Sequence, residues 1–262
     1  MNTPMIQVSQ LSKSFGERRI LHDVNLSIMP GESHLVIGLS GTGKSVLLKC
    51  ILGLLQPDTG DICVDGEEWS CLSENEKLER MRCIGMVFQG SALFDSLPVW
   101  QNVAFVLLRQ GMGKAEAFER AEEVLEKVGL PNIGYKMPAE LSGGMAKRVG
   151  LARAICHRPK IIFYDEPLSG LDPVMSDVIT RLMRQLHEEM QVTSLTIAHN
   201  MKLVREFGDH VSMLYQGRIH LQTRASELDS QHDPIFRQFI EGRADGPMDL
   251  NHPLETVRKG VS

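Results

Sequence analysis

The segment GLSGTGKS at residues 38–45 has the residue types and the spacing that are needed to hold a polyphosphate. It fits the pattern G-x-x-x-x-G-K-[ST], with an apolar run before it and a helical pattern after it, as this motif requires. Glycines let backbone N–H groups approach phosphate oxygens closely, and a helix N-terminus adds a favourable dipole. A lysine here reaches the terminal phosphates and the next hydroxyl ligates Mg²⁺. The predicted contacts are Gly38, Ser40, Gly41, Thr42, Gly43, Lys44, Ser45 and Val46.

Two adjacent carboxylates, Asp165 and Glu166, follow the apolar residues 161–164. Alone, such a pair is more often a solvated strand end. Beside a phosphate loop, a carboxylate at a strand tip can hold Mg²⁺ through water. Successive strand residues point to opposite sides, so we predict that Asp165 faces the metal while Glu166 aims at the attacking water as a general base.

The stretch LSGGM at residues 141–145 precedes a helical pattern that runs through Arg153. Ser142 can cap this helix, which is also the ordinary explanation of the stretch. Two glycines in a first turn cost roughly 1 kcal/mol each relative to alanine. Backbone N–H groups left open to an anion would explain Gly143 and Gly144. One chain can hardly bring this helix start to its own phosphate loop, so we expect a second subunit to supply it.

Strands and helices that alternate along the chain must position these residues, and this order indicates a parallel α/β sheet. Asp65 and Gly66 predict a hairpin turn, and the helical middle of the chain predicts an inserted helical subdomain. The predicted strands cover residues 24–28, 35–37, 62–64, 161–164 and 195–198, and the predicted helices cover residues 46–52, 114–128, 142–153 and 174–190.

The composition bounds the possible partners. The 262 residues are 42% hydrophobic, and 33 acidic against 28 basic residues give a net charge of −5. This balance argues against a nucleic-acid partner. The five cysteines form no C-x-x-C pair, so we expect reduced thiols in a cytosolic protein. No run approaches the ~18 apolar residues of a spanning helix. The polar tail, residues 243–262, predicts disorder unless a partner orders it.

The order of these motifs resembles that of the nucleotide-binding subunits of ABC transporters, over residues 5–240. This resemblance implies a P-loop NTPase fold of ABC type: a RecA-like ATP-binding core, an antiparallel β subdomain and a helical subdomain at roughly residues 90–155. Residues 241–262 would be a C-terminal extension. ATP and Mg²⁺ are the implied cofactors, and a homodimer that closes on ATP and opens after hydrolysis is the implied assembly.

The resemblance also assigns roles to single residues. Phe15 takes the place of the aromatic residue that stacks on adenine, and Gln89 that of the glutamine that links the metal site to the membrane subunits. His199 resembles the switch histidine at the γ-phosphate. Asp172 belongs to the loop that crosses the dimer interface. Ser142, Gly143 and Gly144 would contact the nucleotide of the partner.

Each of these residues also has a simpler interpretation. Phe15 could be a core residue, Gln89 a polar loop residue and His199 a histidine at a strand end. Asp172 could cap the helix that begins at Pro173. Two residues depart from the usual pattern of the family. Phe15 replaces a tyrosine, and Met145 replaces a glutamine in residues 141–145, the signature stretch, which resembles the signature loop of the family.

A narrower resemblance points to the ATPases of Mla/Mce-type lipid transport systems, in GLSGTGKSVLLKCILGLL, GSALFDSLPVWQNVAF and LSGGMAKRVGLARAI. It implies integral-membrane permease subunits, a STAS-domain accessory protein and an Mce-type lipid-binding protein as partners. The chain would then lie at the cytoplasmic face of the inner membrane. Residues 92–108, with Phe94, Trp100 and Phe105 exposed or half-exposed, would form the groove for the permease, or else plain helical core.

The sequence therefore predicts an ATP-hydrolysing subunit that drives phospholipid movement between the two membranes of a Gram-negative envelope. Two alternatives stay open. One is an ABC ATPase for another transported substrate, and the other is a soluble ABC ATPase that acts as an assembly factor without a permease.

Overall fold

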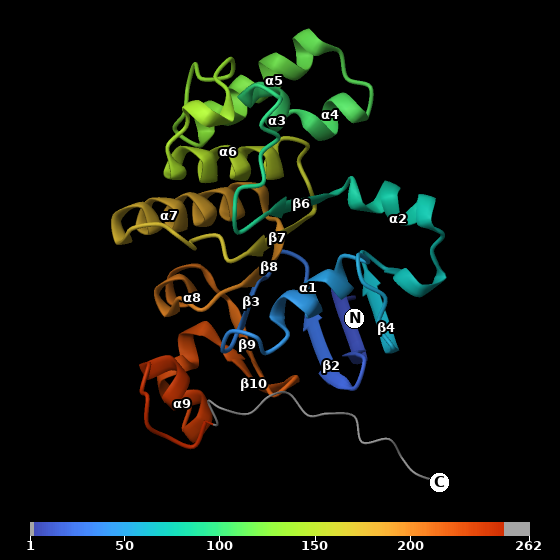
Figure 1. Cartoon of the computed structure of the whole chain (residues 1–262), viewed down its shortest axis with the longest axis vertical. Helices are drawn as coiled ribbons and strands as arrows, with labels where there is room; N and C mark the ends of the chain where they lie inside the picture. The colour runs from blue at the N-terminus through green and yellow to red at the C-terminus, as the bar shows by residue number, and fades with distance from the viewer. Residues whose placement is uncertain (1–2, 249–262) are drawn as a thin grey trace. The chain divides into compact units, whose positions relative to one another are not determined.

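The computed structural model describes residues 3–248 (Figure 1). These residues form two compact units. The first unit contains the described residues up to Lys77 and those from Ile197 onward. The second unit is the intervening segment Leu78–Thr196. Within the described residues, no helix is long and apolar enough to cross a membrane.

An antiparallel sheet in the first unit has the strand order β2-β1-β4-β5. The predicted face of β2, made by Val24, Leu26 and Ile28, is buried. Asp65 and Gly66 adopt φ values of 51° and 80° in the turn after β4, which confirms the predicted hairpin. The strands are β1 (Ile6–Phe15), β2 (Arg18–Ile28), β4 (Thr59–Val64) and β5 (Glu67–Glu68).

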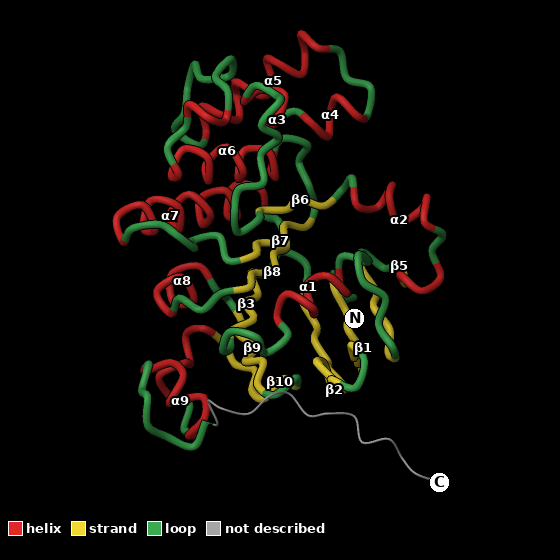
Figure 2. The backbone as a smooth tube through the Cα atoms, viewed as in Figure 1, coloured by secondary structure: helices red, strands yellow, loops and turns green. Residues whose placement is uncertain are grey.

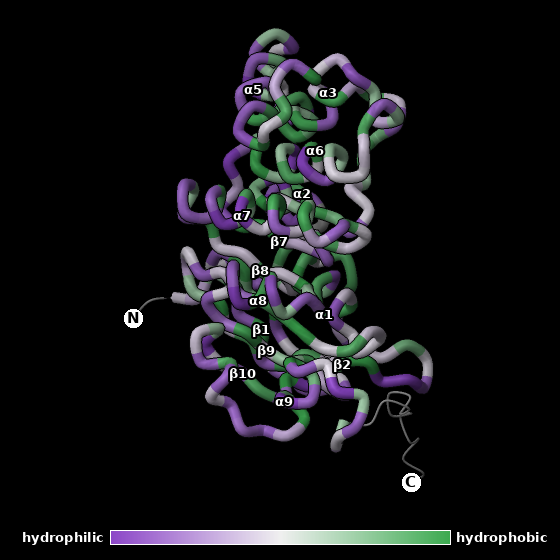
Figure 3. The backbone as a smooth tube through the Cα atoms, turned by 90° about the vertical axis from the view of Figure 1, so that its left-hand side faces the viewer, coloured by the Kyte–Doolittle hydropathy of each residue, from purple (hydrophilic) through white to green (hydrophobic). Residues whose placement is uncertain are grey.

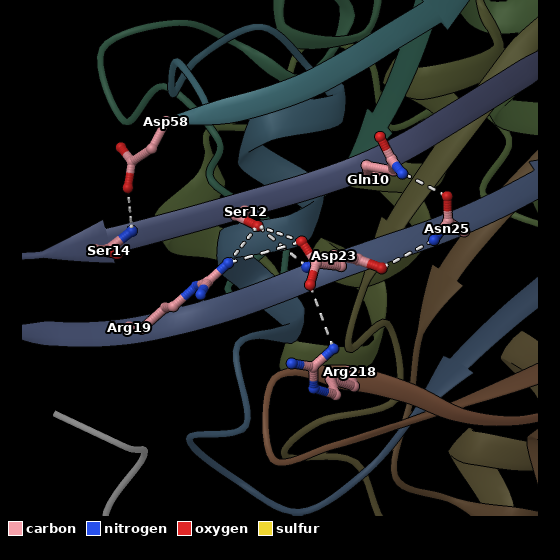
Figure 4. Close-up of polar contacts among 8 residues, drawn as sticks. All are labelled: Gln10, Ser12, Ser14, Arg19, Asp23, Asn25, Asp58 and Arg218. Carbon is pink, nitrogen blue, oxygen red and sulfur yellow. Dashed lines mark hydrogen bonds and ion pairs between the residues drawn. The ribbon is translucent and has the colours of Figure 1, made fainter. Parts of the chain in front are cut away.

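Side chains stabilise an irregular stretch of the β1–β2 pairing (Figure 4). The Ser12 hydroxyl accepts from the Asp23 backbone N–H at 3.1 Å and from Arg19 at 2.9 Å. Asn25 Oδ1 accepts from the Gln10 backbone N–H at 3.0 Å. Gln10 and Asp23 both have positive φ, so these bonds hold two residues that the regular ladder cannot accommodate.

Three further strands of the first unit carry the phosphate loop and its neighbours. Strand β3 (Ser33–Ile37) pairs in parallel with β9 (His210–Tyr215), and β10 (Arg218–Arg224) pairs antiparallel with β9. All five residues of β3 are buried, as expected for a strand in a parallel sheet. The helices of this unit are α1 (Lys44–Ile51), α8 (Met201–Phe207) and α9 (Pro234–Glu241), and 3₁₀ turns cover Trp69–Cys71 and Ala225–Ser230.

The second unit combines strands in the order β8-β7-β6 with a run of helices. Strands β6 (Ile84–Val87) and β7 (Ile161–Asp165) are parallel, and β8 (Thr193–Ile197) ends at the unit boundary. Figure 2 shows helices and loops without a strand between β6 and β7. The helices are α3 (Val99–Val103), α4 (Phe105–Arg109), α5 (Lys114–Lys127), a 3₁₀ turn at Pro138–Glu140, α6 (Gly143–Ile155) and α7 (Pro173–Met190), while α2 (Glu74–Met81) crosses the boundary.

Helix α6 packs directly on β6. A Cβ atom added at Gly85 would lie 2.4 Å from the Ala154 carbonyl oxygen, closer than any side chain tolerates. Glycine at this position of β6 therefore lets the helix approach the strand backbone, and this close approach places the residues of α6 beside the loop that follows β6.

Two predictions about exposure were wrong. Trp100 is buried, with its ring centroid 5.6 Å from that of Phe118, whereas Phe94 is 43% exposed. On α7, Val174 is 72% and Val178 is 41% exposed, although they share with Leu182, Leu186 and Met190 the helical spacing that predicts one apolar stripe. Hydrophilic and hydrophobic residues alternate along α7 in Figure 3. Of this stripe, Leu182 and Leu186 pack into the core, and Met190 is half-buried.

The predicted tail begins with an ordered segment. Met248 is buried, and its backbone N–H donates to Gln238 Oε1 of α9 at 2.7 Å. The Gln238 amide is buried as well, so residues 243–248 fold against α9 instead of lacking structure. Residues 249–262, the rest of the predicted tail, lie outside the described residues.

Candidate functional site

The phosphate loop joins β3 to α1, which confirms the predicted strand, loop and helix. Gly38 and Gly43 have φ values of 149° and 102°, and a Cβ atom at Gly38 would lie 2.3 Å from the Leu214 carbonyl oxygen. Glycine is therefore required at Gly38 both for conformation and for space. The Lys44 ammonium is buried in the loop and donates to the carbonyls of Gly38 at 2.8 Å and Leu39 at 2.7 Å.

The remaining residues of the loop are placed for contact with a ligand. Thr42 donates its hydroxyl to the Leu39 carbonyl at 2.9 Å and so closes the turn. Ser40, Gly41 and Ser45 are exposed. Val46 is half-buried in the first turn of α1. The loop therefore presents an open face of backbone and hydroxyl groups at the start of a helix, which suits an anion.

Phe15 and His199 also belong to the first unit. The Ala198 backbone N–H donates to the Val36 carbonyl of β3 at 3.1 Å, so the exposed His199 follows at the same end of β3 as the phosphate loop. Phe15 is 50% exposed at the end of β1, and the Lys13 ammonium lies 5.6 Å from its ring centroid. This exposure excludes the alternative that Phe15 is a core residue.

The second unit brings Gln89 and Glu166 together. Val87 of β6 lies opposite Tyr164 of β7, so the residues after both strands emerge at one sheet edge. Gln89 Nε2 donates to Glu166 Oε2 at 3.2 Å and to Ser169 Oγ at 3.1 Å. Strand β7 ends at Asp165, and Glu166 has a φ of 45°. A left-handed turn, and not the predicted strand alternation, therefore sets the direction of Glu166.

The signature stretch and Asp172 both begin helices. Ser142 is the N-cap of α6 and accepts from the Met145 backbone N–H at 3.3 Å, as predicted, while Gly143 is exposed beside it. Gly144 lies under the Met175 side chain, whose Cε would be 2.7 Å from an added Cβ. Asp172 caps α7 by accepting from two backbone N–H groups, at 2.9 and 3.0 Å. The capping interpretation of Asp172 is therefore correct.

Two buried cations of α6, which the sequence analysis missed, hold the loop that contains Gln89. Lys147 donates to the Gln89 carbonyl, and Arg153 donates to the carbonyls of Ser91 at 2.8 Å and Ala92 at 2.6 Å. Ser91 and Ala92 have φ values of 61° and 46°, a conformation that needs such support. A sequence signal was available, because Lys147 and Arg153 stand among the small and apolar residues of this helix.

Burial shifts the pKa of both cations in the same direction. It lowers the pKa of Lys147, and the negative charge of Glu166 partly opposes this effect. Burial likewise lowers the pKa of Arg153. A buried cation is retained only where it has firm partners. Hydrogen bonds from α6 therefore hold the loop after β6, and this loop places the Gln89 side chain against Glu166.

The predicted site residues thus form two groups. The first unit holds the phosphate loop together with Phe15 and His199, and the second unit holds Gln89, Asp165, Glu166, Asp172 and the signature stretch.

Comparison with known proteins gives the family. The model of the family described as "ABC transporter" matches residues 21–169. The chain belongs to the ABC transporter ATPase family. A probable ribonucleotide transport ATP-binding protein, mkl of Mycobacterium bovis, is 40% identical over 249 residues, which are 94% of this chain and 69% of mkl.

Two further comparisons define this ABC ATPase more closely. The intermembrane phospholipid transport system ATP-binding protein MlaF of Haemophilus influenzae is 36% identical over 261 residues, covering 99% of this chain and 98% of MlaF. A dimeric ATP-binding cassette in a post-hydrolysis state, bound to ADP and Pi, superposes with a TM-score of 0.77 at 31% identity, covering 84% of this chain and 99% of that one. The predicted ABC fold and the ATP-hydrolysing activity are confirmed.

Proposed function

We propose that this ABC ATPase drives the movement of phospholipid between the inner and outer membranes of a Gram-negative envelope. The observation that carries the proposal is the end-to-end match with MlaF, which leaves almost no part of either chain unmatched. The mkl protein has a higher identity but extends well beyond the matched region. Ribonucleotide transport, the activity that the name of mkl describes, is therefore the second candidate.

The proposed assembly is a homodimer held under integral-membrane permease subunits, at the cytoplasmic face of the inner membrane. A STAS-domain protein and an Mce-type lipid-binding protein complete it. The catalytic domain spans residues 5–240, with the helical subdomain at roughly 90–155 and an extension at 241–262. Phe94, which is 43% exposed, supports residues 92–108 as the permease contact, although the buried Trp100 cannot take part in it.

In the proposed mechanism, the loop of the first unit binds the phosphates of ATP. Lys44 moves from the loop carbonyls to the terminal phosphates, and Phe15 stacks on adenine. Ser45, Gln89 and Asp165 would supply the oxygen ligands that Mg²⁺ prefers. Bound Mg²⁺ would neutralise charge on the β- and γ-phosphates during phosphoryl transfer.

Residues of the second unit handle the proton of the attacking water in this mechanism. Glu166 takes a proton from the attacking water, and the Gln89 amide, 3.2 Å from Glu166 Oε2, orients its carboxylate. His199 contacts the γ-phosphate. Asp172, the cap of α7, lies in the loop that crosses to the other subunit.

Each ATP is shared between two subunits in this proposal. The exposed Ser142 and Gly143 at the start of α6 present backbone N–H groups to the ATP that rests on Lys44 of the partner. Gly144 packs against the Met175 side chain, which leaves no room for a larger residue at this position.

The experiment is to purify the tagged full-length chain from its native membranes in mild detergent and to identify the copurified proteins and lipids by mass spectrometry. We expect a permease, a STAS-domain protein, an Mce-type protein and phospholipid. A copurified permease without an Mce-type protein, with bound nucleotide in place of lipid, would favour the mkl-like activity. If the chain is recovered from the membrane fraction without any copurified protein, the result would support the assembly-factor alternative.

A further inference from the structure

A cluster of metal-ligating side chains lies at the end of β3 opposite the phosphate loop. His34 of β3 pairs in register with His210 of the parallel strand β9. Partners in a parallel pair point to the same face of the sheet, and so do residues two positions apart on one chain. Glu32, His34, His210 and Ser212 therefore lie on one face, within the first unit.

The contacts within this cluster are close. Glu32 Oε1 lies 2.8 Å from His34 Nδ1 and 3.3 Å from His210 Nδ1, and the three ligand atoms all lie within 4.8 Å of one another. The other carboxylate oxygen, Oε2, accepts from the Met29 backbone N–H at 2.9 Å. This bond fixes the Glu32 carboxylate with Oε1 toward both rings.

We propose that Glu32, His34 and His210 form a binding site for a transition-metal ion of the Zn²⁺ class. Two imidazoles and one carboxylate are a ligand set that suits Zn²⁺, with ligand distances of about 2.0–2.2 Å. Ligands on one tetrahedral ion lie roughly 3.3 Å apart at such distances, close to the two separations of Oε1. The two ring nitrogens lie within 4.8 Å of each other, and binding would require the partly exposed His210 ring to turn toward the ion.

The outer contacts of the cluster are those of a metal site. His34 Nε2 lies 2.7 Å from Ser212 Oγ, and a ligating histidine characteristically donates its second ring N–H to such a group. His34 and Glu32 are buried, whereas the His210 side chain is 43% exposed and gives an ion access from solvent. The ion would join the first residues of β3 and β9, and β3 leads directly into the phosphate loop.

The test uses the nucleotide-free, chelator-treated full-length protein, titrated with Zn²⁺ in a calorimeter and with Co²⁺ in a spectrophotometer. We expect one tight Zn²⁺ per chain and a Co²⁺ spectrum of nitrogen and oxygen ligands without a thiolate charge-transfer band. Zn²⁺ should also raise the melting temperature. Ser212→Ala should weaken binding by about 10- to 100-fold, the usual effect of losing an outer-shell partner. His210→Ala should weaken it further.

The matched control is His232→Ala, which removes an exposed histidine of the same unit outside the cluster. It should bind Zn²⁺ like the wild type. His210 is partly exposed, so its variant should keep the metal-free melting temperature, and Ser212→Ala provides the same test if it does not. Absence of tight binding to the wild type, or equal binding by the His210→Ala variant, would overturn the proposal and leave a hydrogen-bonded Glu–His cluster. A thiolate band would place the ion on cysteines and also overturn it.

Discussion

Replacing Lys147 by methionine tests whether α6 positions the catalytic loop. The substitution keeps most of the side-chain volume but removes the charge and the hydrogen bond to the Gln89 carbonyl. A hydrogen bond to a charged group contributes about 1.5–3 kcal/mol. Burial disfavours the Lys147 ammonium and lowers its pKa, so removing the charge offsets much of this loss in the free energy of unfolding. We expect the stability to change by about 1 kcal/mol or less.

The effect on turnover should be larger than the effect on stability. The bond holds the loop that brings the Gln89 amide to Glu166, at 3.2 Å. If the full 1.5–3 kcal/mol is needed in the transition state, kcat falls by about 10- to 150-fold. The KM for ATP should change less than kcat, because the Lys147 hydrogen bond supports the loop of Gln89 and not the phosphate loop.

The assay is steady-state ATP hydrolysis by the purified transporter complex, with the melting temperature measured in parallel. Arg148→Met is the matched control, since Arg148 is the next cation of α6 but donates to the Gly129 carbonyl at 3.0 Å. It should keep its turnover. The double variant with Gln89→Ala should be no slower than Gln89→Ala alone. Normal turnover of Lys147→Met, or a double variant with fully additive losses, would refute the positioning role.

Three other predictions concern the site and the extension. Glu166→Gln should bind ATP but lose about 10²–10⁴-fold in turnover, the usual contribution of a general base, and a rate above a tenth of wild type would exclude that role. A mixed dimer can be made of one Lys44→Ala subunit and one Ser142→Arg subunit, and one of its two ATP sites then keeps both residues intact. Occlusion of ATP should therefore recover partly relative to either mutant homodimer. No recovery would contradict the shared site. Ending the chain after Gly242 should cost about 1–3 kcal/mol, since the buried Gln238 amide loses Met248. Ending it after Met248 should leave the melting temperature unchanged but weaken complex recovery, and full recovery would remove any assembly role of residues 249–262.

Local patterns in the sequence were sufficient to predict the phosphate loop and its helix. Gly38, Gly43 and Lys44 lie within one segment of eight residues. The backbone conformation that this motif requires is formed within the same segment. The cap of α6 by Ser142 was predictable for the same reason. The loop and the cap are therefore set mainly by neighbours in the chain, although the space at Gly38 is also limited by the Leu214 carbonyl.

Features that depend on tertiary packing could not be predicted. Lys147 reaches the Gln89 carbonyl because α6 packs closely on β6 at Gly85, which no periodicity reveals. The register that pairs His34 with His210 joins residues far apart in the chain. A hydrophobic stripe identified α7 as a helix, but it could not separate its buried residues from the exposed Val174.

ATP-dependent transfer of phospholipid tests the central claim most directly. The complex purified with this chain is placed in vesicles that carry a fluorescent phospholipid, and transfer to acceptor vesicles or to the lipid-binding partner is followed after ATP is added. The proposed function predicts transfer that requires ATP and stops in the Glu166→Gln variant. Transfer at the same rate without ATP or with Glu166→Gln, or ATP hydrolysis that moves ribonucleotides and no phospholipid, would contradict it.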